Sequence, residues 1–343
     1  MIMSERWNHR PDGSTWGDFG PDDQLGRLNL ITREKVLEGI AEVKEGLSFC
    51  LSLPLNYPGG SNLNARRHPP EISPCEQNGF LAMNLPMRNL KPGATHVVCD
   101  DRVLLWTQYS TQWDSFAHCG NFFDADGDGK PEIVYYNGYR ANEHVRGPFD
   151  YTVEPPRPLP GPYGAFALGV ENMAAKAIQG RAVLVDLHAH FGRERVPVGY
   201  DELQRVLDKD RVEVGPGDML LVHTGMGGAI MEMRGKPEVD VLLGGFSGLN
   251  GQDARLLQWI TDSRIAAICS DNQAVEAYTT RPPSLPLHLH CLFKLGVPLG
   301  ELWWLGDLAR WLRQNGRSRV LLTAPPLRLP GAVGSPVTPV ATV

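Results

Sequence analysis

"RAVLVDLHAHFGRERVPVGYDELQRVLDK", residues 181–209, decides the fold class, because an apolar run typical of a strand leads into an amphipathic run typical of a helix. The first ten residues predict a strand and residues 200–209 predict a helix. The same order recurs downstream, with strands predicted at 218–225, 265–272 and 319–325 and helices at 251–263, 286–296 and 303–315. Strands that alternate with helices predict a largely parallel sheet with helical crossovers.

The first half of the chain has a different pattern. Residues 33–45 have helical composition, and Thr32 is placed to cap that helix. Between residues 48 and 110, short strand-like runs are broken by clusters of proline and glycine. Such strands add antiparallel pairs, so we expect an α/β fold with a mixed sheet and flanking helices.

The proline-rich segment "VEPPRPLPGPYG", residues 153–164, is compatible with a linker between two domains. We interpret it as a loop within one domain, because the alternation that follows does not begin a self-contained fold. The expected organisation is therefore a single domain over residues 1–343, with an N-terminal extension at about residues 1–32.

Composition excludes several classes of protein. The chain has 343 residues, 42% hydrophobic and 21% charged, and a formal net charge of −6, which is typical of a soluble globular protein. No segment concentrates Lys and Arg into a nucleic-acid-binding face. The polar N-terminus and the lack of an apolar run of about 18 residues argue against secretion and membrane insertion, so we expect a cytoplasmic protein without membrane or nucleic-acid partners. Six cysteines without a Cys-x-x-Cys pair indicate neither a zinc ribbon nor a disulfide framework.

The segment "QYSTQWDSFAH", residues 108–118, concentrates polar side chains. If it is extended, one face carries four of them, Gln108, Ser110, Gln112 and Asp114. Burial of Tyr109 and Trp113 on the opposite face would leave those polar groups merely hydrated. His118 follows Asp114 by four residues, so one helical turn after the strand would make an acid and a titratable base neighbours.

This segment resembles the signature of the cyclase family of metal-dependent hydrolases, which includes bacterial kynurenine formamidase and isatin hydrolase and has the pattern His-x-Gly-Thr-His-x-Asp-x-Pro-x-His. Thr111, Asp114 and His118 match it, whereas Gln108 and Gln112 replace two histidines, Ser110 replaces the glycine and Phe116 the proline. Other blocks resemble longer family members, in order along nearly the whole chain; they include "WGDFGPDDQLGRLNLIT", "SDNQAVEA" and "LPLHLHCLFKLGVPLGEL".

The resemblance implies a swivelling β/β/α fold and a metal centre completed by a late histidine and a following glutamate, here His288 and Glu301. Their surroundings in the sequence support a site. Glu301 is flanked by Leu299, Leu302 and Trp303, and a carboxylate in apolar surroundings needs a cation or a strong donor. His288 is also compatible with a core histidine that is hydrogen-bonded to the backbone.

The two glutamines change the metal chemistry that the resemblance implies. A carboxamide oxygen is a weaker zinc ligand than an imidazole. The remaining donors, Asp114, Glu301, His288 and up to two amide oxygens from Gln108 and Gln112, suit a hard divalent ion. We therefore expect Mn²⁺, with Zn²⁺ or Mg²⁺ as alternatives, or loss of the metal. Ser110 and Thr111 are expected to orient the ligands, and Trp113 to lie near the substrate.

The expected function is metal-dependent hydrolysis of a C–N bond other than a peptide bond, in a small amide, cyclic amide or related carbonyl compound. A metal-activated water would attack the carbonyl, with His118 as the general acid and base. One alternative is a metal-free lyase or cyclase that uses Asp114 and His118, and another is a non-catalytic protein that binds a small molecule. The resemblance also favours a homodimer or homotetramer.

Several weaker patterns in the sequence also involve acidic, histidine and aromatic residues. Asp124, Asp126 and Asp128 match the start of a calcium loop, but Tyr135 stands at its twelfth position, so we favour a solvated acidic turn. His188 and His190 would share one face of a strand, and His288 and His290 would diverge on a helix. Trp106, Tyr136 and Trp303 are candidates for the pocket lining.

Overall fold

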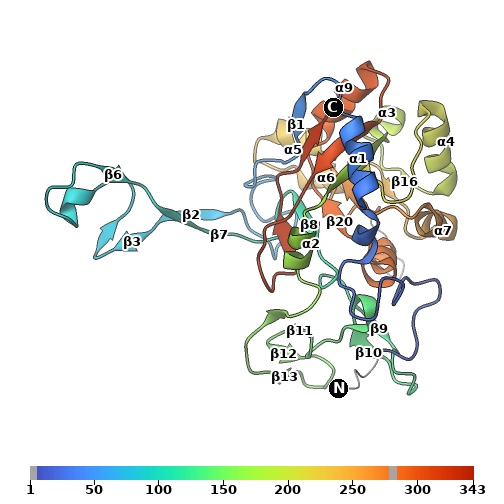
Figure 1. The fold of residues 1–343 in the computed structure, drawn as a ribbon, viewed down its shortest axis with the longest axis horizontal. Coiled ribbons are helices and arrows are strands. Elements are labelled where there is room, and N and C mark those ends of the chain that lie inside the picture. The colour runs from blue at the N-terminus through green and yellow to red at the C-terminus, as the bar shows by residue number, and fades with distance from the viewer. Residues whose placement is uncertain (1–5, 278–283) are drawn as a thin grey trace.

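The computed structural model describes residues 6–277 and 284–343 and has a curled, mixed nine-stranded sheet at its centre (Figure 1). In spatial order the strands are β1 (Ser48–Cys50), β23 (Val340–Thr342), β21 (Arg319–Thr323), β15 (Gln179–Asp186), β17 (Met219–His223), β19 (Ala267–Ser270), β20 (Leu299–Glu301), β8 (Gln112–Asp114) and β22 (Gly334–Pro336). Strands β15, β17, β19 and β20 run parallel, and their outer neighbours pair antiparallel. The predicted α/β class and mixed sheet are therefore confirmed.

Helices cover both faces of this sheet. Alternate residues of each central strand contribute to different cores, as Val183 and Ala182 of β15 illustrate. Helices α4 (Tyr200–Asp210) and α7 (Ala254–Ser263) pack on one side, and α1 (Arg33–Ala41) and α9 (Gly306–Gln314) on the other. Burial on both faces explains why the parallel strands are almost uniformly apolar. As predicted, Thr32 caps α1 by accepting the N–H of Lys35.

The remaining elements surround this framework. The other helices are α2 (Val170–Lys176), α3 (His188–Phe191), α5 (Met226–Met233), α6 (Val239–Gly244) and α8 (Pro286–His288), the 3-10 helices η1 (Gly26–Leu30), η2 (Met87–Asn89) and η3 (Tyr136–Gly138), and the π-helix η4 (Leu289–Leu295). Short antiparallel pairs join β9 (Asn121–Phe123) to β10 (Glu132–Val134), β11 (Val145–Arg146) to β14 (Gly164–Ala165) and β12 (Phe149–Asp150) to β13 (Arg157–Pro158). A short parallel pair joins β16 (Pro197–Val198) to β18 (Gly248–Leu249).

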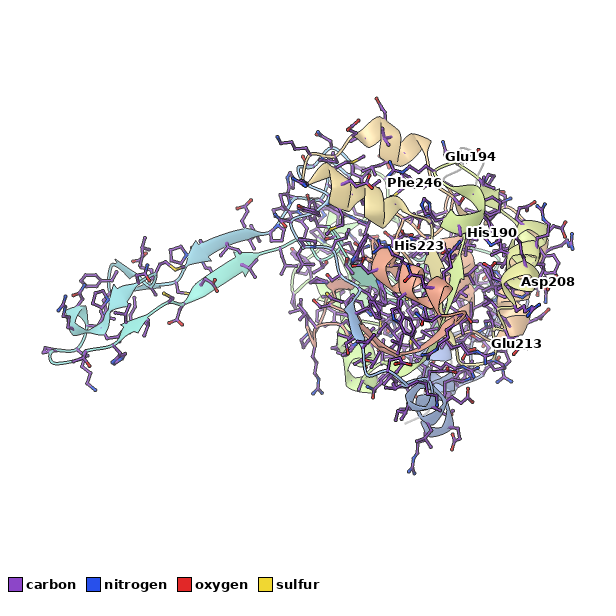
Figure 2. The ribbon with its side chains drawn as sticks, turned by 90° about the horizontal axis from the view of Figure 1, so that it is seen from above. His190, Glu194, Asp208, Glu213, His223 and Phe246 are labelled. Carbon is purple, nitrogen blue, oxygen red and sulfur yellow. The ribbon has the colours of Figure 1, made fainter. Side chains whose placement is uncertain are left out.

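One long hairpin extends away from the rest of the molecule in both views (Figures 1 and 2). It contains β2 (Glu71–Pro74), β3 (Glu76–Gln77), β4 (Phe80–Leu81), β5 (Leu85–Pro86), β6 (Val97–Val98) and β7 (Asp101–Leu104). Strand β2 pairs with β7, β3 with β4 and β5 with β6, so the hairpin forms its ladders within itself. None of the described helices is long and apolar enough to cross a membrane.

Three sequence predictions require correction. The strand predicted over residues 181–190 ends at Asp186, and His188 and His190 lie in the short helix α3 instead of on one strand face. The polar strand predicted to begin at Gln108 begins only at Gln112, because a turn that closes with Tyr109 N–H donating to Trp106 O precedes it. The helix predicted over 286–296 changes after His288 into π geometry.

Candidate metal centre

Two paired strands bring the principal acidic side chains together. The antiparallel register of β8 and β20 places Gln112 opposite Glu301 and Asp114 opposite Leu299. His288, the last residue of α8, completes a group in which Asp114, His288 and Glu301 offer ligand atoms within 4.8 Å of one another. All three side chains are buried. Residues up to 187 positions apart along the chain thus form one compact cluster.

Two carboxylates hold the ring of His288. Its Nδ1 lies 2.6 Å from Glu276 Oε1 and its Nε2 lies 3.3 Å from Glu301 Oε1. Burial alone would lower the pKa of His288, but these two hydrogen bonds outweigh that effect and raise the pKa to about 10. The pKa of Glu301 is lowered because the bond to His288 outweighs its desolvation. Burial raises the pKa of Asp114.

Glu276 is the site residue that the sequence predictions missed. Its buried carboxylate accepts the N–H groups of Leu287 and His288, each at 3.1 Å, as well as the ring N–H of His288. It therefore fixes both the first turn of α8 and the orientation of the imidazole. The block "SDNQAVEA" contains Glu276, but nothing in its local pattern links it to a helix that begins ten residues later.

Gln112 lies directly beside the acidic pair. Its Nε2 is 3.2 Å from Glu301 Oε2 and 3.4 Å from Asp114 Oδ1. The amide oxygen of Gln112 and the second carboxylate oxygen of Asp114 are buried and have no hydrogen-bond partner. Two acceptors without a donor therefore lie in the same buried cluster, which is an uncommon condition for buried polar atoms.

Gln108 is directed at His118 rather than at the carboxylates. Its Nε2 donates to Nδ1 of His118 at 3.0 Å, while its Oε1 accepts the hydroxyl of Thr107 at 3.0 Å. The other ring nitrogen of His118 lies 3.9 Å from Asp114 Oδ1, and its side chain is about one quarter exposed. Gln108 thus has the geometry of a partner for His118, and the expectation that it is a metal ligand is not met by its position.

Three further predicted site residues serve the framework instead. Thr111 donates to Leu302 O and accepts the N–H of Leu53, and Ser110 lies 3.4 Å from Pro54 O, so neither hydroxyl contacts a candidate ligand. Trp113 points into the core, where it stacks edge-on against Trp303 and donates to Ala324 O. Strand alternation explains the position of Trp113, which lies on the opposite face of β8 from Gln112 and Asp114, whereas Ser110 and Thr111 precede the strand.

The remaining histidines lie outside the cluster. His290 contacts Thr261 Oγ1 at 3.0 Å, His190 pairs with Asp210 at 2.8 Å and His188 donates to Gly192 O. Figure 2 shows His190 apart from His223, the last residue of β17. Nδ1 of His223 bonds Asp186 Oδ1 at 2.8 Å, and this bond together with Arg313 lowers the pKa of Asp186 to about 2 despite its burial.

The structure also shows where the acidic turn and the three predicted lining aromatics lie. The carboxylates of Asp124, Asp126 and Asp128 accept backbone N–H groups of their own partly exposed turn, and their ligand atoms lie within 4.8 Å of one another, so the preference for a solvated turn over an ion site stays a prediction. Tyr136 and Trp303 are fully buried in the core, so the prediction that they line a pocket is wrong. Trp106 stacks on His68 with ring centroids 4.8 Å apart.

Comparison with known proteins agrees with this architecture. The family described as "Putative cyclase" matches residues 50–277. A crystal structure of a protein described as a novel cyclase is similar over 96% of this chain and 99% of its own, with 29% identity and a TM-score of 0.73. Isatin hydrolase A from Ralstonia solanacearum (14% identity, 86% and 91% covered) and from Labrenzia aggregata (12% identity, 90% and 97% covered) share the fold, each with a TM-score of 0.53. The comparison with curated proteins gave no match. The family match covers about two thirds of the sequence, and the chain belongs to the cyclase family.

Proposed function

We propose that this chain is a metal-dependent hydrolase that cleaves a C–N bond in a small amide, cyclic amide or related carbonyl compound. The observation that carries the proposal is the buried convergence of Asp114, His288 and Glu301 beside two oxygens that have no donor. The fold shared with two isatin hydrolases supports the substrate class, since isatin is a cyclic amide.

The donor set fits a divalent cation. Three buried carboxylates, those of Asp114, Glu276 and Glu301, surround one imidazole, and burial of uncompensated negative charge is costly. A rotation of the Gln112 amide by 180° would replace its N–H groups by Oε1 next to both carboxylates, because the two ends of a carboxamide have nearly the same shape. Asp114, His288, Glu301 and Gln112 would then hold the ion.

This set contains one nitrogen and several oxygen donors, which favours Mn²⁺ over Zn²⁺, with Mg²⁺ as a further possibility. When bound, the ion would supply an acidified water and polarise the carbonyl oxygen of the substrate. The protein itself contributes the buried position of its carboxylates and the fixed ring of His288, whose Nδ1 proton is held by Glu276.

His118 is the side chain placed to move a proton. Its Nε2 faces Asp114, and its partial exposure leaves it accessible to a substrate. With Gln108 donating to Nδ1, the neutral ring carries its proton on Nε2. If the Gln108 amide turns over, its oxygen accepts a hydrogen bond from the N–H at Nδ1, its nitrogen donates to the hydroxyl oxygen of Thr107, and Nε2 presents a lone pair. We propose that this reversible pair lets His118 accept a proton at Nε2 and later return it to the leaving nitrogen.

Metal analysis tests the proposal. The purified protein, equilibrated with Mn²⁺ and then desalted, should hold a stoichiometric ion and hydrolyse a cyclic amide such as isatin. Asp114→Ala should lose both the ion and the activity, whereas Asp124→Ala, in the exposed acidic turn, should lose neither. A wild-type protein that binds no divalent ion would refute the metal-dependent function.

A second candidate is a metal-free lyase or cyclase that uses Asp114 and His118. The observation that favours it is the Gln112 amide nitrogen, which already donates toward both Asp114 and Glu301 and so partly compensates their charge without an ion. Turnover that is unchanged after exhaustive chelation would support this candidate. Tight ligand binding without turnover, unaffected by Asp114→Ala, would instead indicate a binding protein.

A further inference from the structure

The long hairpin over residues 71–104, called the arm below, lacks a core of its own. It extends from the body in both views, and its strands pair only with one another (Figures 1 and 2). An isolated two-stranded hairpin is at best marginally stable in water. The arm therefore needs a surface to pack against if it is to hold this extended shape.

Exposed apolar side chains are concentrated on the arm. It has about a tenth of the residues of the chain but carries seven of the twenty large hydrophobic side chains that are exposed among the described residues: Ile72, Phe80, Leu81, Met83, Val97, Val103 and Leu104. Ile72 and Val103 are direct cross-strand partners and are 70% and 52% exposed. Exposed apolar side chains that are concentrated on one element are typical of a protein interaction site.

The charges of the arm are arranged in two groups of opposite sign. The β2–β7 ladder nearer the body and the residue next to it carry three acidic side chains, Glu71, Asp100 and Asp101, against one basic side chain, Arg102, while Glu76 lies further out on β3 (Figure 1). The far end, beyond the β5–β6 pair, carries Arg88 and Lys91 and no acid. These seven side chains are exposed, and none makes an ion pair within the described parts of the chain. When two arms lie antiparallel, the basic tip of each arm therefore faces the acidic base of the other.

We propose that the arm is a dimerisation element that packs against the arm of a second copy of this chain, with the two arms antiparallel. A two-fold axis then places the basic tip of each arm on the acidic base of the other and buries the apolar side chains between them. Such an interface is self-complementary, which is the usual arrangement in homodimers. Opposite charges favour this alignment and disfavour a parallel one.

The base of the arm adjoins the candidate metal centre. Just before the arm, Arg67 donates to Gln108 O at 2.6 Å, and His68 stacks on Trp106, which follows the arm. The two chain segments that enter and leave the arm are therefore joined at the residue that contacts His118. Docking of the arm on a second copy would restrain this junction.

Charge exchange tests the proposal without altering the candidate site. The first variant, Arg88→Glu with Lys91→Glu, has an acidic tip and an acidic base; the second, Asp100→Lys with Asp101→Lys, has a basic tip and a largely basic base. Because these side chains are exposed and make no ion pair, the circular dichroism spectra of both variants should match that of the wild type. The matched control is Lys209→Glu with Arg211→Glu, which changes the same charge at the C-terminal end of α4.

Sedimentation velocity should show the wild type and the control as dimers, or as multiples of a dimer. Each arm variant alone should sediment at half the mass of the wild type. An equimolar mixture of the two variants should regain the wild-type mass, because both tip-to-base contacts are then attractive. A wild type that stays monomeric at about 100 μM, or arm variants that associate as tightly as the wild type, would overturn the proposal.

Discussion

Glu276→Gln is the substitution that tests most directly how the centre is built. The wild-type carboxylate accepts three donors, with Oε2 receiving Leu287 N–H and Oε1 receiving both the backbone and the ring N–H of His288. Glutamine offers only one acceptor oxygen. If that oxygen takes the Oε1 position, the two bonds to His288 survive and the new NH₂ group faces Leu287 N–H, which loses its acceptor.

The cost to folding can be worked from this count. One buried N–H left without an acceptor costs about 1–3 kcal/mol. Since the entropy of unfolding is roughly 2.1 cal/mol/K per residue, a chain of 343 residues should lose only about 1–4 °C in melting temperature. The effect on the metal should be larger, because loss of the charged partner of a metal-binding imidazole typically lowers metal affinity by about 10–100-fold.

Two measurements separate these effects. Thermal unfolding in the presence of a chelator reports the folding cost, and calorimetric titration with Mn²⁺ at 25 °C reports the affinity. The matched control is Glu143→Gln, which alters an exposed carboxylate 3.6 Å from the ring of His144 and should change neither value. If Glu276→Gln binds Mn²⁺ within twofold of the wild type, Glu276 does not position His288 for an ion and the assignment fails.

Three other perturbations address separate parts of the molecule. Gln108→Leu should lower turnover by about 10–100-fold and alter the pH profile of turnover. Its Mn²⁺ affinity should stay nearly unchanged, because Gln108 contacts His118 and no candidate ligand. Equal losses in turnover and metal affinity would contradict this. Gln112→His should raise Zn²⁺ affinity by roughly tenfold or more in competition titrations, whereas Gln108→His should not. The pKa of Asp186 falls from its usual value near 3.8 to about 2, so its ionised form stabilises the fold above pH 4 by roughly 2 kcal/mol, and this stability is lost as pH falls toward 2. Asp186→Asn should therefore make the free energy of unfolding in urea depend less on pH between 4 and 2. An unchanged pH dependence would refute the pair with His223.

The sequence predicted the elements whose pattern is local. The central strands are continuous apolar runs because both faces are covered, and α1 begins where Thr32 caps it. Contacts between residues far apart in the sequence leave no such local pattern. Nothing in residues 270–277 reveals that Glu276 will bond two N–H groups of α8, because that contact depends on the crossing of two separate segments. The error at residues 188–190 has a local cause, because histidine is compatible with either the end of a strand or a short helix.

Gln108 and Gln112 have different roles in the structure, although the sequence predicts that both lie on one face of the same strand. Alternation along an extended strand would have placed Gln108 and Gln112 on the same face and made both of them candidate ligands. The turn after Trp106 breaks that alternation, and the tyrosine hydroxyl of residue 109 fixes the turn by bonding Gly59 and Gly60. Gln112 therefore stays in register with Asp114 on β8, while Gln108 reaches His118 from the side. The two glutamines that replace histidines of the family pattern thus have separate consequences. Gln112 changes the donor atoms available to an ion, and Gln108 determines which ring nitrogen of His118 carries the proton.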